Sequence, residues 1–355
     1  MAHLFDSFAT RGVTLRNRIG ISPMCQYTAE NGFPGDWHLV HLGSRAVGGA
    51  GVVIAEATAV EPRGRISVAD TGIWSDAHVD AWARITRVIS AHGAVPAIQL
   101  AHAGRKAGWS RPWPTYRLLT AEEGGWTPVA PSPIPFNEKY PTPHALSVAE
   151  IDAIQAEFVA AARRSVAAGF EVIELHAAHG YLLNSFMSPI SNHRTDAYGG
   201  SFAGRARMLL ETTARVRAVI PDKLPLWVRI SCSDWAPGGW TLDDSVELAR
   251  MLGASGADLI DCSSGGNSPT AQIPTAPGYQ VPFAEAIRRD AGIATAAVGM
   301  ITEARQAQAI VEAGQADVIL IARQSLRDPY WPIRAAYELK APDRCPLPVQ
   351  YARGW

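Results

Sequence analysis

The segment Phe170-Glu-Val-Ile-Glu-Leu-His-Ala-Ala-His-Gly-Tyr181 begins as a β-strand and ends in two imidazoles and a phenol. Residues 170–175 are rich in β-forming side chains and follow a glycine, which is typical of a buried strand. Residues three apart on a strand face opposite sides, so His176 and His179 converge only if the strand stops at His176 and the chain then turns helically. The segment therefore predicts a central strand that leads directly into an active-site floor.

Three interpretations of the two histidines are open at this point. A metal site needs a third ligand, and no further His, Cys or carboxylate stands at ligand spacing nearby. In a second interpretation, His176 and His179 donate hydrogen bonds to a carbonyl or anionic oxygen while Tyr181 donates a proton. In the third, both imidazoles are satisfied inside a core.

The chain on either side of this segment alternates strand and helix. Apolar runs predict strands at 19–25, 52–57, 95–100, 170–175, 226–231, 257–263, 294–299 and 317–322, with helices at 37–47, 77–92, 147–168, 201–219, 241–253, 283–289, 302–313 and 331–339. Strict alternation implies a parallel sheet. Eight units at this length favour an α/β fold of one domain, residues 1–355, closed as a (β/α)8 TIM barrel.

A long excursion, residues 103–146, follows the third predicted strand. It is rich in Gly, Pro and Trp and shows no sustained hydrophobic period. Loops of this length inside a compact domain are usually functional. We expect this excursion to be a lid over the carboxyl ends of the strands.

Barrel chemistry sits at the carboxyl ends of the strands. The predicted ends are Cys25, Ala57, Gln99, His176, Arg229, Ser263, Gly299 and Arg323. Gly299 and Arg323 stand where many barrels bind phosphate, and Gln99 offers a donor and an acceptor to the edge of a pyrimidine-like ring. Arg229 needs an anionic partner, either on a ligand or on a structural carboxylate. Together these groups describe a site that flavin mononucleotide, FMN, would use in full.

Composition narrows the partners to small molecules. The 32 Lys and Arg residues nearly balance 33 Asp and Glu residues and are scattered, so neither nucleic acid nor an anionic membrane is expected. No apolar run approaches the length of a membrane span, and the amino terminus has no signal-like segment. The 4 cysteines form no CxxC pair. We expect a cytoplasmic protein with reduced thiols.

Several motifs, in order, carry a resemblance to a known family. They are Leu15-Arg-Asn-Arg18, Ser22-Pro-Met-Cys25, Glu56-Ala-Thr-Ala59, Gly72-Ile-Trp-Ser75, Gln99-Leu-Ala-His-Ala-Gly-Arg-Lys106, His176-Ala-Ala-His-Gly-Tyr181, Asn192-His-Arg-Thr-Asp-Ala-Tyr-Gly-Gly200, Cys262-Ser-Ser-Gly265 and Gln350-Tyr-Ala-Arg-Gly-Trp355. The ordered set resembles the Old Yellow Enzyme family of FMN-dependent ene-reductases, and within it the thermophilic-like bacterial branch. The resemblance extends over nearly the whole chain.

The resemblance implies a non-covalent FMN and a reaction for it. FMN would contact Ser22, Pro23, Met24, Cys25, Ala57, Gln99, Arg229, Gly299, Met300, Ala322 and Arg323. His176 and His179 would hold the carbonyl oxygen of an activated alkene, so that hydride from reduced flavin reaches the β-carbon while Tyr181 protonates the α-carbon. Tyr27 would contact the substrate. Cys25 would tune the flavin and touch the substrate, its alternative role being a small buried hydrophobe.

The carboxyl-terminal segment 345–355 resembles one that, in relatives, inserts an arginine into the neighbouring subunit's site. Arg353 is therefore the candidate for a residue that binds substrate in trans, within a homodimer or homotetramer. A frayed terminus is the alternative. Ala322 departs from the pattern, because close relatives have glycine there. Its N–H stays available to a phosphate if φ is negative.

The implied activity is NADPH-dependent reduction of the C=C bond of enones, enals and maleimides, with nitro compounds as further candidates, in a ping-pong cycle. No metal is expected. Two alternatives are another FMN barrel of the dienoyl-CoA reductase type and a metal-dependent barrel hydrolase that uses His176 and His179.

Overall fold

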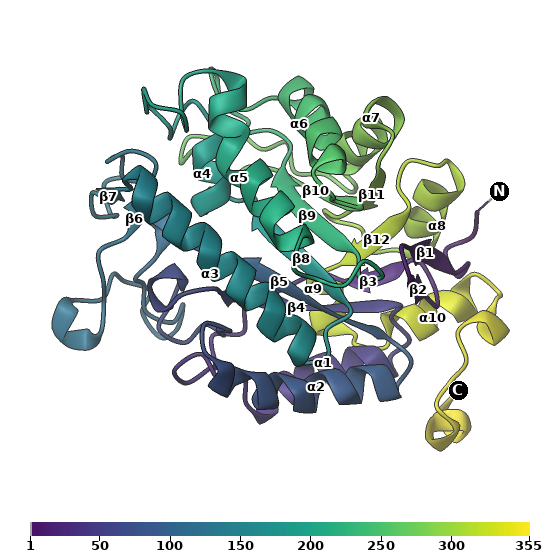
Figure 1. Cartoon of the computed structure of the whole chain (residues 1–355). Helices are drawn as coiled ribbons and strands as arrows, with labels where there is room; N and C mark the ends of the chain where they lie inside the picture. Colours follow the sequence, from purple (N-terminus) through teal and green to yellow (C-terminus); the bar gives the residue numbers. More distant parts are fainter. Residues whose placement is uncertain (1) are drawn as a thin grey trace.

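The computed structural model describes residues 2–355 and contains a closed barrel of parallel strands surrounded by helices (Figure 1). The strands follow the barrel in the order β10-β11-β12-β3-β4-β5-β8-β9. Their bounds are β3 Ile19–Ile21, β4 Val52–Ala59, β5 Val95–Ala101, β8 Val172–Ala177, β9 Leu226–Ser231, β10 Leu259–Ser263, β11 Ala294–Ala297 and β12 Val318–Ile321. The predicted TIM barrel is confirmed.

The helices that follow the strands pack one face against the barrel. They are α1 Asp36–Val47, α2 Val79–Ala91, α3 Val148–Ala167, α5 Phe202–Arg217, α6 Leu242–Ala254, α7 Val281–Ala291, α8 Ala304–Glu312 and α10 Trp331–Glu338. Ser147, Ser201 and Thr241 accept the N–H of the residue three positions on, which satisfies a donor that the first helical turn leaves free. These caps explain why α3, α5 and α6 begin where the sequence predicts.

Three strands end earlier than predicted. β11 ends at Ala297, before Gly299. β3 ends at Ile21, well before Cys25, because Pro23 has no N–H to donate to a sheet ladder. Its neighbour β12 ends at Ile321, the partner of Ile21. Arg323 therefore begins the short helix α9, Arg323–Arg327, and does not end a strand.

Three further features differ from the prediction. The residue before α8 is Glu303, where Thr302 was expected. A short helix, α4 Leu182–Met187, follows the histidine segment. An antiparallel hairpin, β1 Phe8–Thr10 and β2 Val13–Leu15, packs Val13 and Leu15 with the side chains inside the barrel. Neither α4 nor the β1–β2 hairpin has a hydrophobic period long enough to identify it from sequence.

The barrel interior changes character along the strands. One cluster of buried apolar side chains joins the earlier residues of several strands, among them Val52, Val95, Val172, Trp227 and Leu259. Side chains two residues apart on a strand share a face, so the next inward positions are occupied by polar residues at the carboxyl ends. These ends form the floor of the site.

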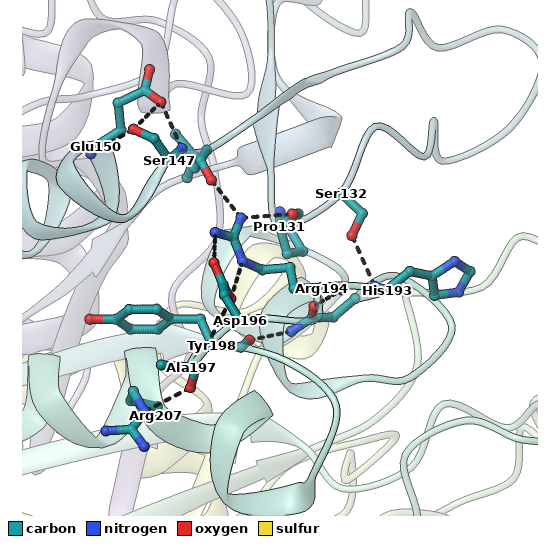
Figure 2. Close-up of polar contacts among 12 residues, drawn as sticks. Pro131, Ser132, Ser147, Glu150, His193, Arg194, Asp196, Ala197, Tyr198 and Arg207 are labelled. Atoms are coloured by element: carbon teal, nitrogen blue, oxygen red, sulfur yellow. Dashed lines mark hydrogen bonds and ion pairs between the residues drawn. The ribbon is translucent and has the colours of Figure 1, made fainter.

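The excursion 103–146 is fixed at its base by Arg194 (Figure 2). The Arg194 guanidinium donates to the carbonyl oxygens of Pro131 and Leu146 and pairs with Asp196. Ser132 Oγ accepts the N–H of His193 at 2.9 Å. Two short parallel strands, β6 Val129–Ala130 and β7 His144–Ala145, join the two sides of this base. The base of the excursion is therefore tied to the loop that precedes α5.

Candidate active site at the carboxyl ends of the strands

The histidine segment turns differently from the prediction. β8 continues to Ala177, and the chain then reverses through His179 and Gly180, both left-handed with φ of 61° and 74°. A Cβ on Gly180 would lie 2.3 Å from the carbonyl oxygen of Gly266, so only glycine fits. This turn brings three rings together. The ring centre of His176 lies 5.1 Å from that of His179 and 5.0 Å from that of Tyr181.

His179 is held on three sides. Its N–H donates to Ser231 Oγ at 2.8 Å, and its Nε2 lies 2.7 Å from Ser263 Oγ. Lys106 Nζ donates to the His179 carbonyl oxygen at 2.9 Å and lies over the Tyr181 ring, 5.2 Å from its centre. A left-handed conformation is uncommon for a residue with a side chain, and these contacts stabilise it here.

Burial sets the protonation of the three rings. It lowers the pKa of His176 and His179 well below the usual value for imidazole, so both are neutral at neutral pH. The N–H of Ala178 donates to His176 Nδ1 at 3.3 Å, so the neutral ring carries its proton on Nε2. Burial also raises the pKa of Tyr181, which keeps its phenol proton. The site therefore presents neutral hydrogen-bond donors.

A buried polar layer lies across the barrel beneath these rings. Gln99 Nε2 donates to Glu174 Oε1 at 2.8 Å, and these residues are partners in the register of β5 and β8. Arg229 Nε lies 3.1 Å from Asp261 Oδ2, and Nη1 donates to Ser22 Oγ at 3.1 Å. Arg229 thus has a structural carboxylate as its partner, one of the two alternatives that the sequence left open.

Sequence reasoning missed Glu174 and Asp261. Both are fully buried, and burial raises the pKa of each carboxyl, an effect that the Arg229 charge partly offsets. The signal was present as a lone carboxylate inside an apolar strand, in Val172-Ile-Glu-Leu175 and in Leu259-Ile-Asp-Cys262. A buried acid needs a partner, and such a residue indicates a polar network.

A cavity of about 420 Å³ opens beside Arg229. Its lining includes the predicted phosphate-site residues Gly299, Met300, Ala322 and Arg323, together with Ser263, Gln280 and Gln324. Gly299 has φ of 118°, and a Cβ there would lie 2.7 Å from Gln280 Nε2. Ala322 has φ of −103°, which meets the condition for an available N–H. Three arginines, Arg229, Arg323 and Arg327, and a glycine turn around one cavity fit a phosphorylated flavin.

The other predicted residues lie on both sides of this site. Pro23 and Met24 follow β3, and Cys25 and Tyr181 pack against the same small apolar cluster of Ile66, Ala103 and Ala107. Burial raises the pKa of the Cys25 thiol, so it stays protonated.

Tyr27 lies 6.0 Å from the Trp113 ring of the excursion, and Ala57 lines a small cavity with Tyr181. Arg353 lies elsewhere, in the exposed terminal turn Val349–Gly354.

Residues 2–355 contain neither a candidate metal-binding cluster nor a helix that could span a membrane. No group of three or more His, Cys, Asp and Glu side chains in this range could hold a metal ion. Within the same range, no helix has both the length and the apolar character needed to cross a membrane.

Comparison with known proteins places the chain in a family. Residues 3–341 match the model of the NADH:flavin oxidoreductase / NADH oxidase family. An NADPH dehydrogenase of Geobacillus sp. is 49% identical over 354 residues, which are 99% of this chain and 98% of that protein. These matches extend over the barrel, the excursion and most of the carboxyl-terminal region.

Solved structures show the same architecture. The Old Yellow Enzyme homologue of Zymomonas mobilis superposes with a TM-score of 0.78 at 27% identity, over 100% of this chain and 96% of that one. A 2-naphthoyl-CoA reductase superposes with a TM-score of 0.85 at 25% identity, but the chain spans only 53% of its length. The resemblance to the Old Yellow Enzyme family is confirmed. The chain therefore belongs to the NADH:flavin oxidoreductase / NADH oxidase family, and FMN is its cofactor.

Proposed function

We propose that this enzyme uses NADPH to reduce the C=C bond of α,β-unsaturated carbonyl compounds, with NADPH and alkene binding in turn at one site. The observation that carries the proposal is the convergence of His176, His179 and Tyr181, whose ring centres lie 5.0 to 6.4 Å apart. Relatives 45 to 49% identical are NADPH dehydrogenases, which supports NADPH as the reductant. Enones, enals and maleimides are the proposed substrates, with nitro compounds as further candidates.

We propose that the polar layer and the adjacent cavity hold FMN. Arg323, with the N–H groups of the turns at Gly299, Met300 and Ala322, would bind the phosphate. Arg229 and Gln99 would bind the polar edge of the ring, supported by Asp261 and Glu174. Ser22, Pro23, Met24, Cys25 and Ala57 would line the remaining contacts. Bound FMN would supply the hydride that reaches the β-carbon.

Two neutral donors and a phenol suit the substrate. His176 Nε2–H would donate to the carbonyl oxygen, and His179 would share this oxygen, since burial keeps both rings uncharged. A polarised carbonyl makes the β-carbon electrophilic, and Tyr181 would then give its proton to the α-carbon. Tyr27 and Cys25 would contact the substrate from the segment that follows β3. Membership of a flavin family sets aside the metal-hydrolase alternative for the two histidines.

Two segments would complete the site from outside the barrel. The excursion 103–146 would cover the mouth, since its base is fixed by Arg194 and its Trp113 lies beside Tyr27. Arg353 is exposed in a terminal segment that extends away from the barrel (Figure 1). We propose that it binds substrate in the neighbouring subunit of a homodimer or homotetramer. Arg353→Ala should then raise the KM for the alkene, and an unchanged KM and kcat would refute this role.

Visible spectroscopy of the purified enzyme tests the function. The protein is mixed anaerobically with NADPH and then with 2-cyclohexenone. A flavin absorbance that bleaches with NADPH and returns with the enone is the expected result. Bleaching without return would refute the alkene assignment, and a protein that FMN cannot reconstitute would refute the proposed cofactor contacts.

A further inference from the structure

Asp70 is a buried carboxyl that the proposed mechanism does not use. Its side chain is 2% exposed. Oδ2 accepts the N–H of Ile66 at 2.7 Å, and the Asp70 N–H donates to the Ser67 carbonyl oxygen at 3.0 Å. Among the residues that the structure describes, the other carboxyl oxygen, Oδ1, is buried and has no hydrogen-bond partner. A buried oxygen without a partner is costly, and it indicates a contact beyond the protein's own side chains.

Asp70 and Tyr181 line one small cavity. The cavity has a volume of about 10 Å³, and its other walls are the small or apolar residues Ala57, Ala59, Gly64, Ile66, Ala101 and Ala103. This volume corresponds to about one water molecule. A water needs polar partners to be stable in such a site, and the carboxyl and the phenol provide them.

The surroundings of Asp70 favour its protonated form. Burial and the nearby Glu56 raise the pKa of Asp70 to about 8. Glu56, on β4, is itself buried. The backbone N–H groups of Ile66 and Ser67, and then the Arg65 charge, lower the pKa but are outweighed. The titratable groups of the other elements around this region, Cys25, Tyr27, Tyr116 and Tyr181, all have raised pKa values and are uncharged at neutral pH.

We propose that Asp70 is a relay residue that returns a proton to Tyr181 through one water held in this cavity. The inference rests on the proposed role of Tyr181 as proton donor. After Tyr181 gives its phenol proton to the α-carbon, the water passes a proton to the phenolate and takes one from the Asp70 carboxyl. The Asp70 carboxylate then regains a proton from bulk water. Only protons move in these steps, and each transfer breaks one O–H bond and forms another.

Asp70→Asn in the FMN-loaded enzyme separates this role from a structural one. Asparagine keeps an oxygen for the Ile66 N–H but has no acidic proton. The first turnover of 2-cyclohexenone by the reduced enzyme starts with protonated Tyr181, so it should exceed later turnovers by at least about tenfold. Tyrosinate absorbance in the ultraviolet should persist after that first turnover. Equal rates in all turnovers without tyrosinate would overturn the relay.

Asp234→Asn is the matched control. Asp234 is also buried, has a raised pKa and accepts hydrogen bonds from Ser188 Oγ and the Trp240 N–H. Its variant should show no difference between first and later turnovers. If the first turnover of Asp234→Asn also exceeded later turnovers by about tenfold, loss of any buried acid would produce this burst. That result would overturn the assignment to Asp70.

Tyr181→Phe distinguishes failure of the relay from failure of the proposed function. If Tyr181→Phe reduces alkenes at the wild-type rate, both the proton-donor role of Tyr181 and the Asp70 relay are refuted. If Tyr181→Phe reduces alkenes slowly but Asp70→Asn shows no burst, only the relay is refuted. A crystal structure of the FMN-bound enzyme provides a test without any variant. We expect a water within hydrogen-bond distance of Asp70 Oδ1 and Tyr181 Oη, and its absence would overturn the relay.

Discussion

The lower and upper halves of the barrel interior come from the same strands but contain opposite chemistry. The lower half is an apolar cluster that includes Val172, Trp227 and Leu259. Two residues further along the same strands, the inward positions are Glu174, Arg229 and Asp261. Apolar burial stabilises the lower half without any directional contact. The upper half tolerates its buried charges because they are paired, and only this half can bind a polar cofactor.

One barrel thus separates stability from chemistry along the same strands. A change in the lower half should alter unfolding and leave the reaction steps alone. A change in the upper half should alter the reaction, ligand binding or the pH dependence, with smaller effects on folding. Four variants test this division, beginning with the largest expected effect.

Tyr181→Phe should impair only the chemistry of the upper half. Removing the proposed proton donor should slow the alkene half-reaction by about 10²–10⁴-fold, the usual contribution of a general acid. Reduction of the flavin by NADPH should continue, since that step needs no proton from the phenol. Stopped-flow absorbance measures the two half-reactions separately. An equal loss in both would contradict the proton-donor role.

Trp227→Ala should destabilise the folded protein through the lower half. Trp227 is fully buried in the apolar cluster, so its truncation should lower the free energy of unfolding by about 3–5 kcal/mol. Urea unfolding measures this loss, and the alkene half-reaction of the folded fraction should stay close to that of the wild type. A loss below about 1 kcal/mol would show that the barrel interior repacks around the missing ring.

Asp70→Asn should remove a pH dependence that belongs to the loop after β4, beside the upper half. The pKa of Asp70 is about 8 in the folded protein and near 3.8 when unfolded, so the folded state binds more protons between these values. Its stabilising contribution is full below about pH 3.8 and is lost as pH rises to about 8. Wild-type stability relative to the variant should therefore fall with pH, by up to about 1.4 kcal/mol per pH unit.

The pH test has a matched reference in the lower half. Trp227→Ala lacks any change in a titratable group, so its loss of stability should be the same at every pH. Urea unfolding between pH 5 and 8 measures both variants. A difference between wild type and Asp70→Asn that does not change with pH would mean that Asp70 is ionised in the folded protein.

Ser263→Ala should have the smallest effect. Ser263 Oγ lies 2.7 Å from His179 Nε2 and helps to orient that ring. Losing one such hydrogen bond costs about 0.5–1.5 kcal/mol, which corresponds to at most about tenfold weaker binding of a phenol ligand. Absorbance titration of the flavin with a phenol measures the change. Unaltered affinity would show that the turn alone positions His179.

The sequence predicted most of the fold because its signals were local. Apolar runs such as 226–231 and capping residues such as Ser147 and Thr241 act within a few residues of each other. The predicted strand ends also pointed to Arg229, Gly299 and Arg323, which the structure brings to one cavity. Strand ends were harder to predict. β3 stops at Ile21 because of Pro23, and the end of β12 follows from its pairing with β3.

The order of strands and helices, the family and the residue types of the site can all be read from the amino-acid sequence. Tertiary structure alone decided that His179 and Gly180 turn left-handed, because that conformation depends on Lys106, Ser231 and the Gly266 carbonyl far along the chain. It also decided that Arg229 pairs with Asp261 and that Asp70 shares a cavity with Tyr181. The physical reason is that burial, pairing and pKa depend on neighbours in space, which the order of residues does not display.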